Sequence, residues 1–198
     1  MCRFIESIKL LDGVFYRLEF HHKRMNICSD LFYPEANPMD LQSALNDSHP
    51  PQTGLYKCRV VYDSKIRKIE YRPYLKREIN SLRIVQVQIE SLPYKKADRS
   101  DFDRAFAMRG NFDEVLLVKN GLLTDTSICN IALFDGVSWF TPSMPLIYGV
   151  NRANLIEEGK MIERNILLDD LKNFSHIRLF NAMIEFGDIE LEIGNIHL

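Results

Sequence analysis

Two adjacent lysines, Lys95 and Lys96, are the side chains in this sequence best suited to covalent chemistry. They stand in the segment SLPYKKADRSDF, between an expected strand and an expected helix. A lysine amine whose pKa is lowered in a pocket becomes a nucleophile and forms Schiff bases with carbonyl groups. A lysine that is only solvated at the surface has the same sequence signature. Taken alone, the segment leaves both interpretations open.

Two further features could bind an anion. His21 and Arg24 lie three residues apart at the start of an expected helix and therefore share one helix face. A guanidinium at such a place can form two parallel hydrogen bonds to a phosphate. A second helix is expected to open at Gly149, and its first backbone N–H groups form an anion site. Every helix has such an end, so neither feature is specific by itself.

A polar turn between two expected strands carries Asp125 and Asn130, in the segment LLTDTSICNIALF. Residues of this kind usually do no more than shape the turn. A carboxylate at the same place could also hold a protonated ring nitrogen in a pocket.

The composition is that of an ordinary globular protein. The chain has 198 residues, of which 46% are hydrophobic and 26% charged, enough for one large domain or two small ones. The 25 basic and 27 acidic side chains give a net charge of -2, which argues against a dedicated nucleic-acid binder. The stretch YKCRVVYDSKIRKIEYRPYLKR interleaves basic and aromatic residues and keeps an RNA-binding sheet open as an alternative. The same alternation describes the outer face of any antiparallel sheet, which is the interpretation we prefer.

The termini and the cysteines favour a cytoplasmic protein with no membrane partner. Charged residues at positions 6 and 9 interrupt what would have to be the apolar core of a signal peptide. No window approaches the length of a membrane span. The cysteines are scattered without the spacing of a zinc site, so we expect no metal and reduced, buried thiols. The four cysteines are Cys2, Cys28, Cys58 and Cys129.

The hydrophobic pattern predicts β-hairpins interrupted by helices, which is the pattern of an α+β fold. Strands are expected over residues 4–11, 14–20, 55–63, 66–74, 82–90, 114–119, 128–134, 137–142 and 176–180. Helices are expected over residues 21–33, 39–47, 151–161 and 168–171, and from a Ser100 cap to Gly110. Charged and turn-forming residues near 77–81 suggest a boundary between a domain of residues 1–78 and a domain of residues 79–198.

Five motifs, in the right order, give this sequence a specific resemblance to a known family. FIESIKLLDGVFYRLEFHHKRM is similar to F-E-T/S…DG…H-x-x-R-L/M, and KKADR is similar to K-x-L-N-R. FDEVLLVKNGLLTDTSICNIALF, WFTPSMPLIYGVNR and RLFNAMIEF resemble three later motifs of the same family. The chain resembles the class IV aminotransferases, which are fold-type IV pyridoxal-phosphate (PLP) enzymes. This family includes branched-chain and D-amino-acid transaminases and 4-amino-4-deoxychorismate lyase.

The resemblance implies a fold, a cofactor and a partner. The fold is a small α+β N-terminal domain followed by a larger, β-rich domain of pseudo-barrel form. The cofactor is pyridoxal 5'-phosphate, and the partners are a small amino-acid-like substrate and a second copy of the chain, since fold-type IV proteins build their sites in homodimers. The expected larger domain would contain Lys95.

The resemblance also implies a role for each matched residue. Lys95 carries the Schiff base, because an arginine follows it four residues later as in K-x-L-N-R, and Lys96 takes its place only if the register differs by one. Asp125 stands where the family has glutamate and pairs with the pyridine nitrogen. The remaining cofactor-binding residues are Arg24 on the phosphate, Asn130, the backbone N–H groups of Val150 and Asn151, and the late turn of Asn181 and Ala182.

Two departures from the family pattern bear on activity. Aspartate is one methylene shorter than the usual glutamate, so its contact with the ring is either rebuilt or weakened. The chain also begins almost at the F-E-T/S motif, which leads us to expect a shortened N-terminus and a pocket that is more open or closed by the partner subunit.

The expected activity is that of 4-amino-4-deoxychorismate lyase, which eliminates pyruvate and leaves 4-aminobenzoate for folate synthesis. The pair Asp98-Arg99 is closer to the N-R of the lyase than to the tyrosine-bearing segment of branched-chain transaminases. The alternatives are a branched-chain or D-amino-acid transaminase of the same family, and a homologue that binds PLP without full activity.

Overall fold

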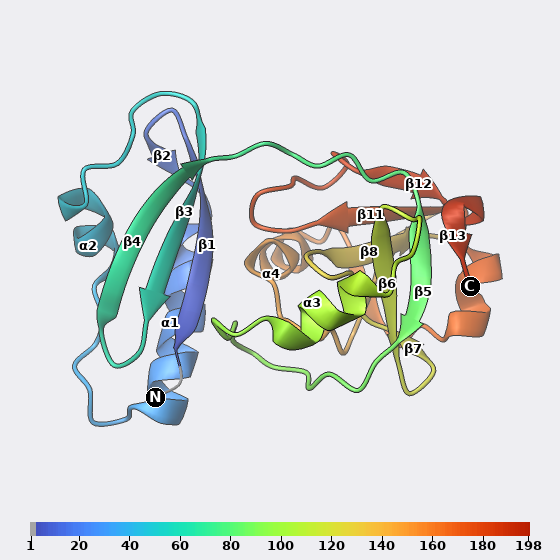
Figure 1. Ribbon diagram of the computed structural model, residues 1–198, viewed down its shortest axis with the longest axis horizontal. Helices are drawn as coiled ribbons and strands as arrows, with labels where there is room; N and C mark the ends of the chain where they lie inside the picture. Colours follow the sequence, from blue (N-terminus) through green and yellow to red (C-terminus); the bar gives the residue numbers. More distant parts are fainter. Residues whose placement is uncertain (1–2) are drawn as a thin grey trace. The chain divides into compact units, whose positions relative to one another are not determined.

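The computed structural model describes residues 3–198, which divide into two compact units (Figure 1). Unit 1 contains the chain up to Lys76 together with Pro93–Asp98, and unit 2 contains Arg77–Leu92 and Arg99–Leu198. The expected single boundary after residue 78 therefore differs from this division, which assigns Lys95 to unit 1.

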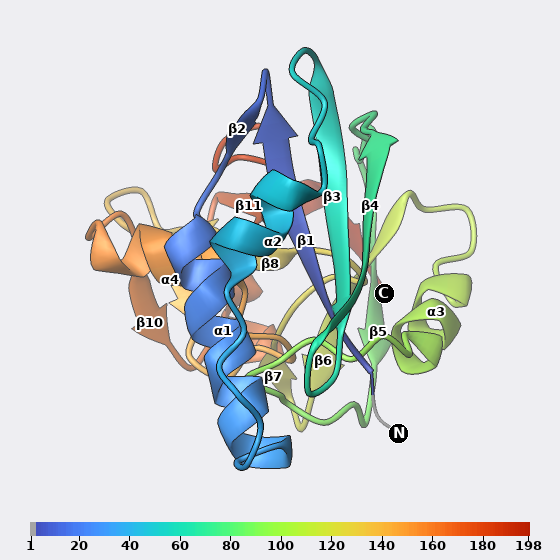
Figure 2. The same ribbon diagram turned by 90° about the vertical axis from the view of Figure 1, so that its left-hand side faces the viewer.

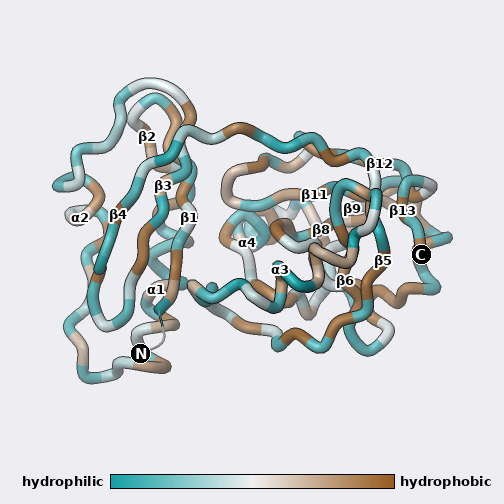
Figure 3. The backbone as a smooth tube through the Cα atoms, in the orientation of Figure 1, coloured by the Kyte–Doolittle hydropathy of each residue, from teal (hydrophilic) through white to brown (hydrophobic). Residues whose placement is uncertain are grey.

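Unit 1 is a four-stranded antiparallel sheet with two helices on one face (Figures 1 and 2). The strands follow the order β2-β1-β3-β4. They are β1 (Phe4–Leu11), β2 (Val14–Phe15), β3 (Leu55–Tyr62) and β4 (Ile66–Pro73), and the helices are α1 (Leu18–Phe32) and α2 (Leu41–Asp47). Alternate residues of β1 are fully buried against α1, whereas β4 is mostly hydrophilic, drawn in teal in Figure 3.

The first hairpin is shorter than the sequence predicts. Asp12 and Gly13 both take positive φ angles, of 47° and 80°, as the D-G turn requires. The returning strand then ends at Phe15, because Arg17 also adopts a left-handed conformation (φ 54°) and turns the chain into α1. The prediction of a strand up to residue 20 was wrong, and the helix begins at Leu18 instead of residue 21. The short strand leaves the first half of one edge of β1 without β2 as a partner.

Residues 95–97 occupy that edge. Ile5 donates a backbone hydrogen bond of 2.9 Å to the carbonyl of Lys95, and Ala97 donates one of 2.8 Å to the carbonyl of Arg3. Phe4 and Lys96 face each other in this antiparallel bridge. This pairing is the physical reason why Lys95 belongs to unit 1 and not to the larger unit.

Unit 2 contains two sheets. The five-stranded sheet has the order β10-β9-β8-β11-β12 and the four-stranded sheet the order β13-β5-β6-β7, in which β5 and β6 run parallel. The strands are β5 (Leu82–Gln86), β6 (Glu114–Lys119), β7 (Leu122–Leu123), β8 (Asn130–Phe134), β9 (Trp139–Pro142), β10 (Ile162–Arg164), β11 (His176–Phe180), β12 (Glu190–Glu192) and β13 (Ile196–His197). The helices are α3 (Ser100–Ala107), α4 (Val150–Glu157) and two short 3-10 helices, η1 (Leu168–Asn173) and η2 (Ile193–Asn195).

Several element boundaries in unit 2 correct the prediction. The strand expected over 82–90 ends at Gln86, and the chain continues as a loop to Leu92. Helix α3 begins at Ser100, so the cap position falls on Arg99, whose side chain makes no capping hydrogen bond. Strand β11 is not the last one, since β12 pairs with it and β13 pairs with β5. These late strands are only two or three residues long, too short for a periodic signal.

The described cysteines are buried and unpaired by disulfides. Burial raises the pKa of Cys58 and of Cys129 to about 12, which keeps these thiols protonated and inert. Cys28 is also buried, and Cys2 lies outside the described residues. Among residues 3–198, no helix has the length and apolar character needed to cross a membrane.

Candidate functional site

A buried cluster of three polar side chains lies between β1 and α1 in unit 1. Arg24 donates from Nε to Glu6 Oε1 at 2.9 Å and from Nη2 to Glu6 Oε2 at 2.5 Å. His21 Nδ1 lies 2.6 Å from Glu6 Oε2. Glu6 and His21 are fully buried and Arg24 is 7% exposed. Glu6 shares the inner face of β1 with apolar neighbours, so its charge must be balanced by a partner of opposite charge.

The charges within this cluster follow from the geometry. Burial would raise the pKa of Glu6, but the Arg24 charge and the His21 hydrogen bond outweigh it and hold the pKa at about 2. Burial lowers the pKa of His21 below its usual value despite the Glu6 carboxylate. His21 is therefore neutral near pH 7 and donates through Nδ1, while its buried Nε2 has no hydrogen-bond partner among the described residues. The Glu6 carboxylate accepts hydrogen bonds from Nε and Nη2 of the Arg24 guanidinium.

Lys95 lies in the same unit as this cluster. Its backbone is held by Ile5, and the ring of the preceding Tyr94 packs edge-on against Phe4 and Phe32 at 5.3 and 5.1 Å. Lys95 is half-buried, whereas Lys96 is exposed. The positive charge of Lys95 is close enough to contribute to the lowered pKa of His21, after burial and Arg24. The contrast in burial favours Lys95 over Lys96 as the reactive lysine.

Asp125 is a hydrogen-bond acceptor for three groups in unit 2. Its Oδ1 accepts from Asn130 Nδ2 at 2.7 Å, and its Oδ2 accepts from the backbone N–H groups of Leu146 (2.6 Å) and Ile147 (3.0 Å). The side chain is 3% exposed. Burial raises the pKa of Asp125 to about 6, although these three donors favour the ionised form. Oδ1 accepts only one of the donors, so it can accept another.

Asn130 links this carboxylate to the start of α4. Its Nδ2 also donates to the carbonyl of Ile147 at 2.9 Å, and its Oδ1 lies against the backbone of Gly149. A Cβ atom on Gly149 would lie 1.9 Å from Asn130 Oδ1 and would clash with it, so this position requires glycine. Gly149 is the residue before α4, so the helix starts without a capping side chain.

The start of α4 and the late turn lie side by side. The N–H groups of Val150 and Asn151 precede the first intrahelical hydrogen bond, which Ala153 donates to Gly149. Asn151 Nδ2 donates to the carbonyl of Asn181 at 2.9 Å. Asn181 Oδ1 in turn accepts from the N–H groups of Met183 (2.7 Å) and Ile184 (3.0 Å) and closes a turn around the half-buried Ala182. Asn151 is 1% exposed, and its Oδ1 has no partner among the described residues.

Arg99, four residues after Lys95, contacts other residues of unit 2. Arg99 Nη2 donates to the carbonyl of Ser127 at 2.6 Å, and its guanidinium lies 4.2 Å from the ring centroid of Phe102. Ser127 Oγ donates to the fully buried Glu114 at 2.8 Å. These contacts fix the loop that follows Asp125 within unit 2.

The structure thus groups the predicted residues into two sets. Arg24 and Lys95 lie in unit 1, and the remaining six form a connected cluster in unit 2. That cluster consists of Asp125, Asn130, Val150, Asn151, Asn181 and Ala182. Sequence reasoning missed the buried partners of Arg24, although a glutamate among the apolar residues of FIESIKLL was a usable signal for one of them.

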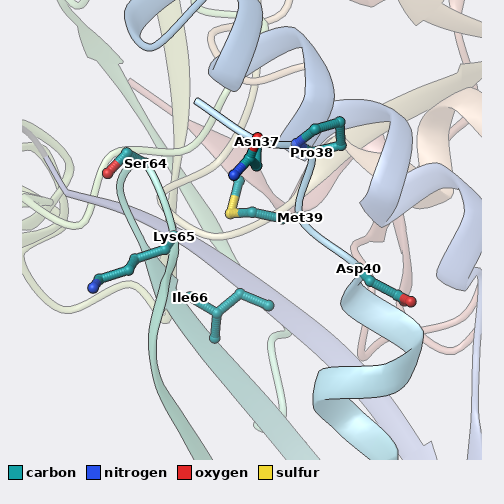
Figure 4. A pocket seen from close by; sticks show the side chains of 7 residues that line it. All are labelled: Asn37, Pro38, Met39, Asp40, Ser64, Lys65 and Ile66. Atoms are coloured by element: carbon teal, nitrogen blue, oxygen red, sulfur yellow. The ribbon is translucent and has the colours of Figure 1, made fainter. Parts of the chain in front are cut away.

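A surface hollow in unit 1 contains none of the predicted residues. It lies between Asn37–Asp40, before α2, and Ser64–Ile66 in the turn from β3 to β4 (Figure 4). Its side chains take part in neither of the clusters described above, so the hollow does not enter the candidate site.

Comparison with known proteins decides the family. Residues 3–190 match the family described as amino-transferase class IV. The chain belongs to the class IV aminotransferase family. An uncharacterised protein of Haemophilus influenzae is 32% identical over 180 residues, which cover 90% of this chain and 96% of that protein. The family membership, the α+β fold and the enzyme class expected from the five motifs are confirmed.

Solved structures of similar proteins agree with this assignment. A proposed 4-amino-4-deoxychorismate lyase from Haemophilus somnus 129pt is 28% identical, with a TM-score of 0.85 over 92% of this chain and 97% of that one. A hypothetical aminotransferase from Mycobacterium tuberculosis, solved in a PLP-bound form, shares the fold at 15% identity with a TM-score of 0.77, over 98% of this chain and 81% of that one. A proposed aminodeoxychorismate lyase of Schizosaccharomyces pombe is 35% identical over 75 residues, 35% of this chain and 32% of that protein.

Both sets of residues in this class IV chain are suited to a phosphorylated cofactor. In unit 2, the uncapped start of α4 presents N–H groups beside the turn at Asn181, which is a cradle for an anion. Asp125 keeps an acceptor position on Oδ1 for a protonated ring nitrogen. In unit 1, Glu6 holds the Arg24 guanidinium through Nε and Nη2, and a guanidinium is the side chain best suited to a two-point contact with phosphate.

We expect Gly149→Ala to destabilise the protein by about 1–3 kcal/mol, the usual cost of overpacking a close contact. The added methyl group would displace Asn130, which Asp125 and Ile147 hold in place. Urea unfolding measures the loss, and Gly194→Ala is the matched control, because a Cβ there meets no atom within 4 Å. Equal stability of the two variants would contradict the close contact.

We expect Asp125 to titrate near pH 6 in the folded protein. A pKa raised from 3.8 means that its contribution to stability is fully present below pH 3.8 and is lost as the pH rises through about 6. Between pH 4 and pH 7, the wild type should therefore lose about 2 kcal/mol of stability relative to Asp125→Asn, which cannot titrate.

Urea unfolding of the wild type and Asp125→Asn at several pH values measures this difference. The carboxyl carbon of Asp125, followed by NMR in the wild type, gives the pKa directly. Parallel stability curves together with a carboxyl resonance that titrates below pH 4 would refute the raised pKa.

Proposed function

We propose that this class IV enzyme is a PLP-dependent lyase that resembles 4-amino-4-deoxychorismate lyase, eliminates pyruvate and forms 4-aminobenzoate. The observation that carries the proposal is the pairing of residues 95–97 with β1, because it holds Lys95 in the same unit as the Arg24 cluster. Two similar proteins named as proposed lyases of this kind support the choice of reaction.

We propose PLP-binding roles for residues of each unit. In unit 1, Arg24 is the candidate ligand of the phosphate. In unit 2, the N–H groups of Val150 and Asn151 and the turn at Asn181 and Ala182 are candidate phosphate contacts. Asp125, oriented by Asn130, would accept a hydrogen bond from the pyridine nitrogen and keep that nitrogen protonated. When bound, PLP supplies an electron sink for the negative charge that develops next to the substrate amine.

Lys95 moves the proton in this reaction. Its amine acts first as a general base and removes the proton from the carbon that carries the substrate amine. It then acts as a general acid and donates a proton at a different atom. In the lyase, the C–O bond between the ring and the enolpyruvyl group breaks, and the leaving group takes up a proton on its methylene carbon and becomes pyruvate. A transaminase returns the proton to the cofactor and releases a keto acid, and a branched-chain or D-amino-acid transaminase therefore remains the second candidate.

The Glu6–Arg24 pair holds the phosphate-binding arginine in place. A buried guanidinium that is fixed on one edge has lost most of its conformational freedom before the ligand arrives, so less entropy is lost on binding. A homodimer, a role in folate synthesis and a cytoplasmic location complete the proposal.

We expect purified protein with PLP to show a visible absorption band that disappears on borohydride treatment, with the cofactor then fixed covalently to Lys95. Peptide mapping identifies the modified lysine. Lys95→Ala should abolish the reducible band, whereas Lys96→Ala, a matched change at the exposed neighbour, should retain it. An adduct on Lys96, or a protein that stays colourless with PLP, would overturn the assignment.

The reaction itself is expected to release pyruvate and 4-aminobenzoate from aminodeoxychorismate in equal amounts. A coupled lactate dehydrogenase assay measures the pyruvate. No pyruvate, combined with keto acid formation from glutamate or a branched-chain amino acid, would replace the lyase with a transaminase. A reducible band without either activity would identify a PLP-binding homologue that has lost catalysis.

A further inference from the structure

The segment that carries Lys95 leaves unit 2 and returns to it within six residues. This lysine segment, Pro93–Asp98, begins after Leu92 and ends before Arg99, the residue that precedes α3 (Figure 1). Lys95 is three residues from Leu92 and four from Arg99. A fully extended chain would place its Cα atom about 11 Å from the first and about 14 Å from the second, so these distances are upper limits. The contacts that hold Leu92 and Arg99 in unit 2 therefore limit where Lys95 can lie.

The residue before the lysine segment is bound to the backbone that orients Asp125. The N–H group of Leu92 donates to the carbonyl of Leu146 at 2.9 Å, and Leu92 forms a parallel bridge with Ile147. The N–H groups of Leu146 and Ile147 are two of the three donors to the Asp125 carboxylate. The chain therefore enters the lysine segment directly from a contact with the neighbours of Asp125.

Arg99 binds the other end of the lysine segment to the loop that follows Asp125. Its Nη2 donates to the carbonyl of Ser127 at 2.6 Å, and its own carbonyl accepts the first helical hydrogen bond of α3, from Asp103 at 2.9 Å. Ser127 lies two residues after Asp125, and its Oγ donates to the fully buried Glu114. The acceptor of Arg99 is thus itself held in the core of unit 2, and both ends of the lysine segment are fixed beside Asp125.

The environment of Arg99 differs from that of a second arginine close to it in sequence. The Arg99 guanidinium is half-buried and lies 4.2 Å from the ring centroid of Phe102, a cation–π contact that restricts it further. Arg104, five residues later, is exposed and pairs with Asp101 on the surface of α3. Exposed pairs of this kind contribute little to stability. Replacing Arg104 therefore removes an arginine from the same helix region without changing a contact of the lysine segment.

We propose that Arg99 is a positioning residue for the reactive lysine, because its bond to the Ser127 carbonyl holds the lysine segment on the loop that carries Asp125. This inference rests on the proposed function, in which Lys95 is the reactive residue. The resemblance to the family used Arg99 only to choose between Lys95 and Lys96. Proton transfer requires that the reacting atoms be aligned. A lysine segment that is released at one end keeps its amine but loses that alignment.

The first test measures amide hydrogen exchange by NMR in the protein without PLP. The N–H group of Ala97 donates to Arg3 within the lysine segment's pairing with β1. In Arg99→Ala we expect this amide to exchange about tenfold faster, as for the loss of one hydrogen bond from a charged donor, while the amides of β3 keep their wild-type rates. Arg104→Ala should leave Ala97 unchanged. Unchanged exchange at Ala97 in Arg99→Ala would overturn the inference, and faster exchange in β3 as well would show that Arg99 only stabilises the fold.

The second test uses the adjacent lysine as an internal competitor. After borohydride reduction with PLP, we expect the adduct on Lys95 alone in the wild type and divided between Lys95 and Lys96 in Arg99→Ala. The kcat for pyruvate release should fall about tenfold with little change in KM, because alignment and not binding is lost. Arg99→Lys keeps a donor for the Ser127 carbonyl and should return the adduct to Lys95. A raised KM with unchanged kcat would instead assign Arg99 to substrate binding and overturn the inference.

The same preparations distinguish failure of this inference from failure of the proposed function. An adduct confined to Lys95 in both the wild type and Arg99→Ala, with equal kcat values, refutes only the positioning role of Arg99. A wild-type protein that forms no adduct with PLP refutes the proposed function, and with it the role of Arg99 toward a reactive lysine.

Discussion

Strand β1 is the constraint on which unit 1 depends, because it makes two separate contacts. Its inner face holds Glu6 against Arg24, and its edge pairs with the segment that contains Lys95. The edge is available because β2 pairs with only the last two residues of β1. A longer hairpin would satisfy the same N–H and carbonyl groups and exclude the lysine segment.

Buried charge organises both units. Removing one partner of a buried ion pair is strongly destabilising, since the remaining charge stays without compensation in a medium of low polarity. Glu6 is neutralised by Arg24, whereas Asp125 is surrounded by neutral donors and keeps a raised pKa. The pKa of Glu6 is therefore about 2, whereas that of Asp125 is about 6. Glu6 therefore fixes a cation, whereas Asp125 is the carboxylate that we propose as the hydrogen-bond acceptor for a protonated ring nitrogen.

Local sequence signals predicted most of the elements, but they missed Glu6, the buried partner of Arg24. Asx-Gly turns and alternating strands located β1, β3, β4 and β6, because these signals act between residues close in the chain. The register of Lys95 against β1 could not be predicted, since it joins residues about ninety positions apart.

The sequence by itself determined the family and the α+β class, because motif order and residue type are properties of the chain. Only the tertiary structure decided that Lys95 belongs with Arg24, that Glu6 and His21 surround that arginine, and that Gly149 must be glycine beside Asn130. Each of these depends on distances between residues far apart in sequence. Such distances are set by strand pairing and packing, for which the linear pattern carries no direct signal.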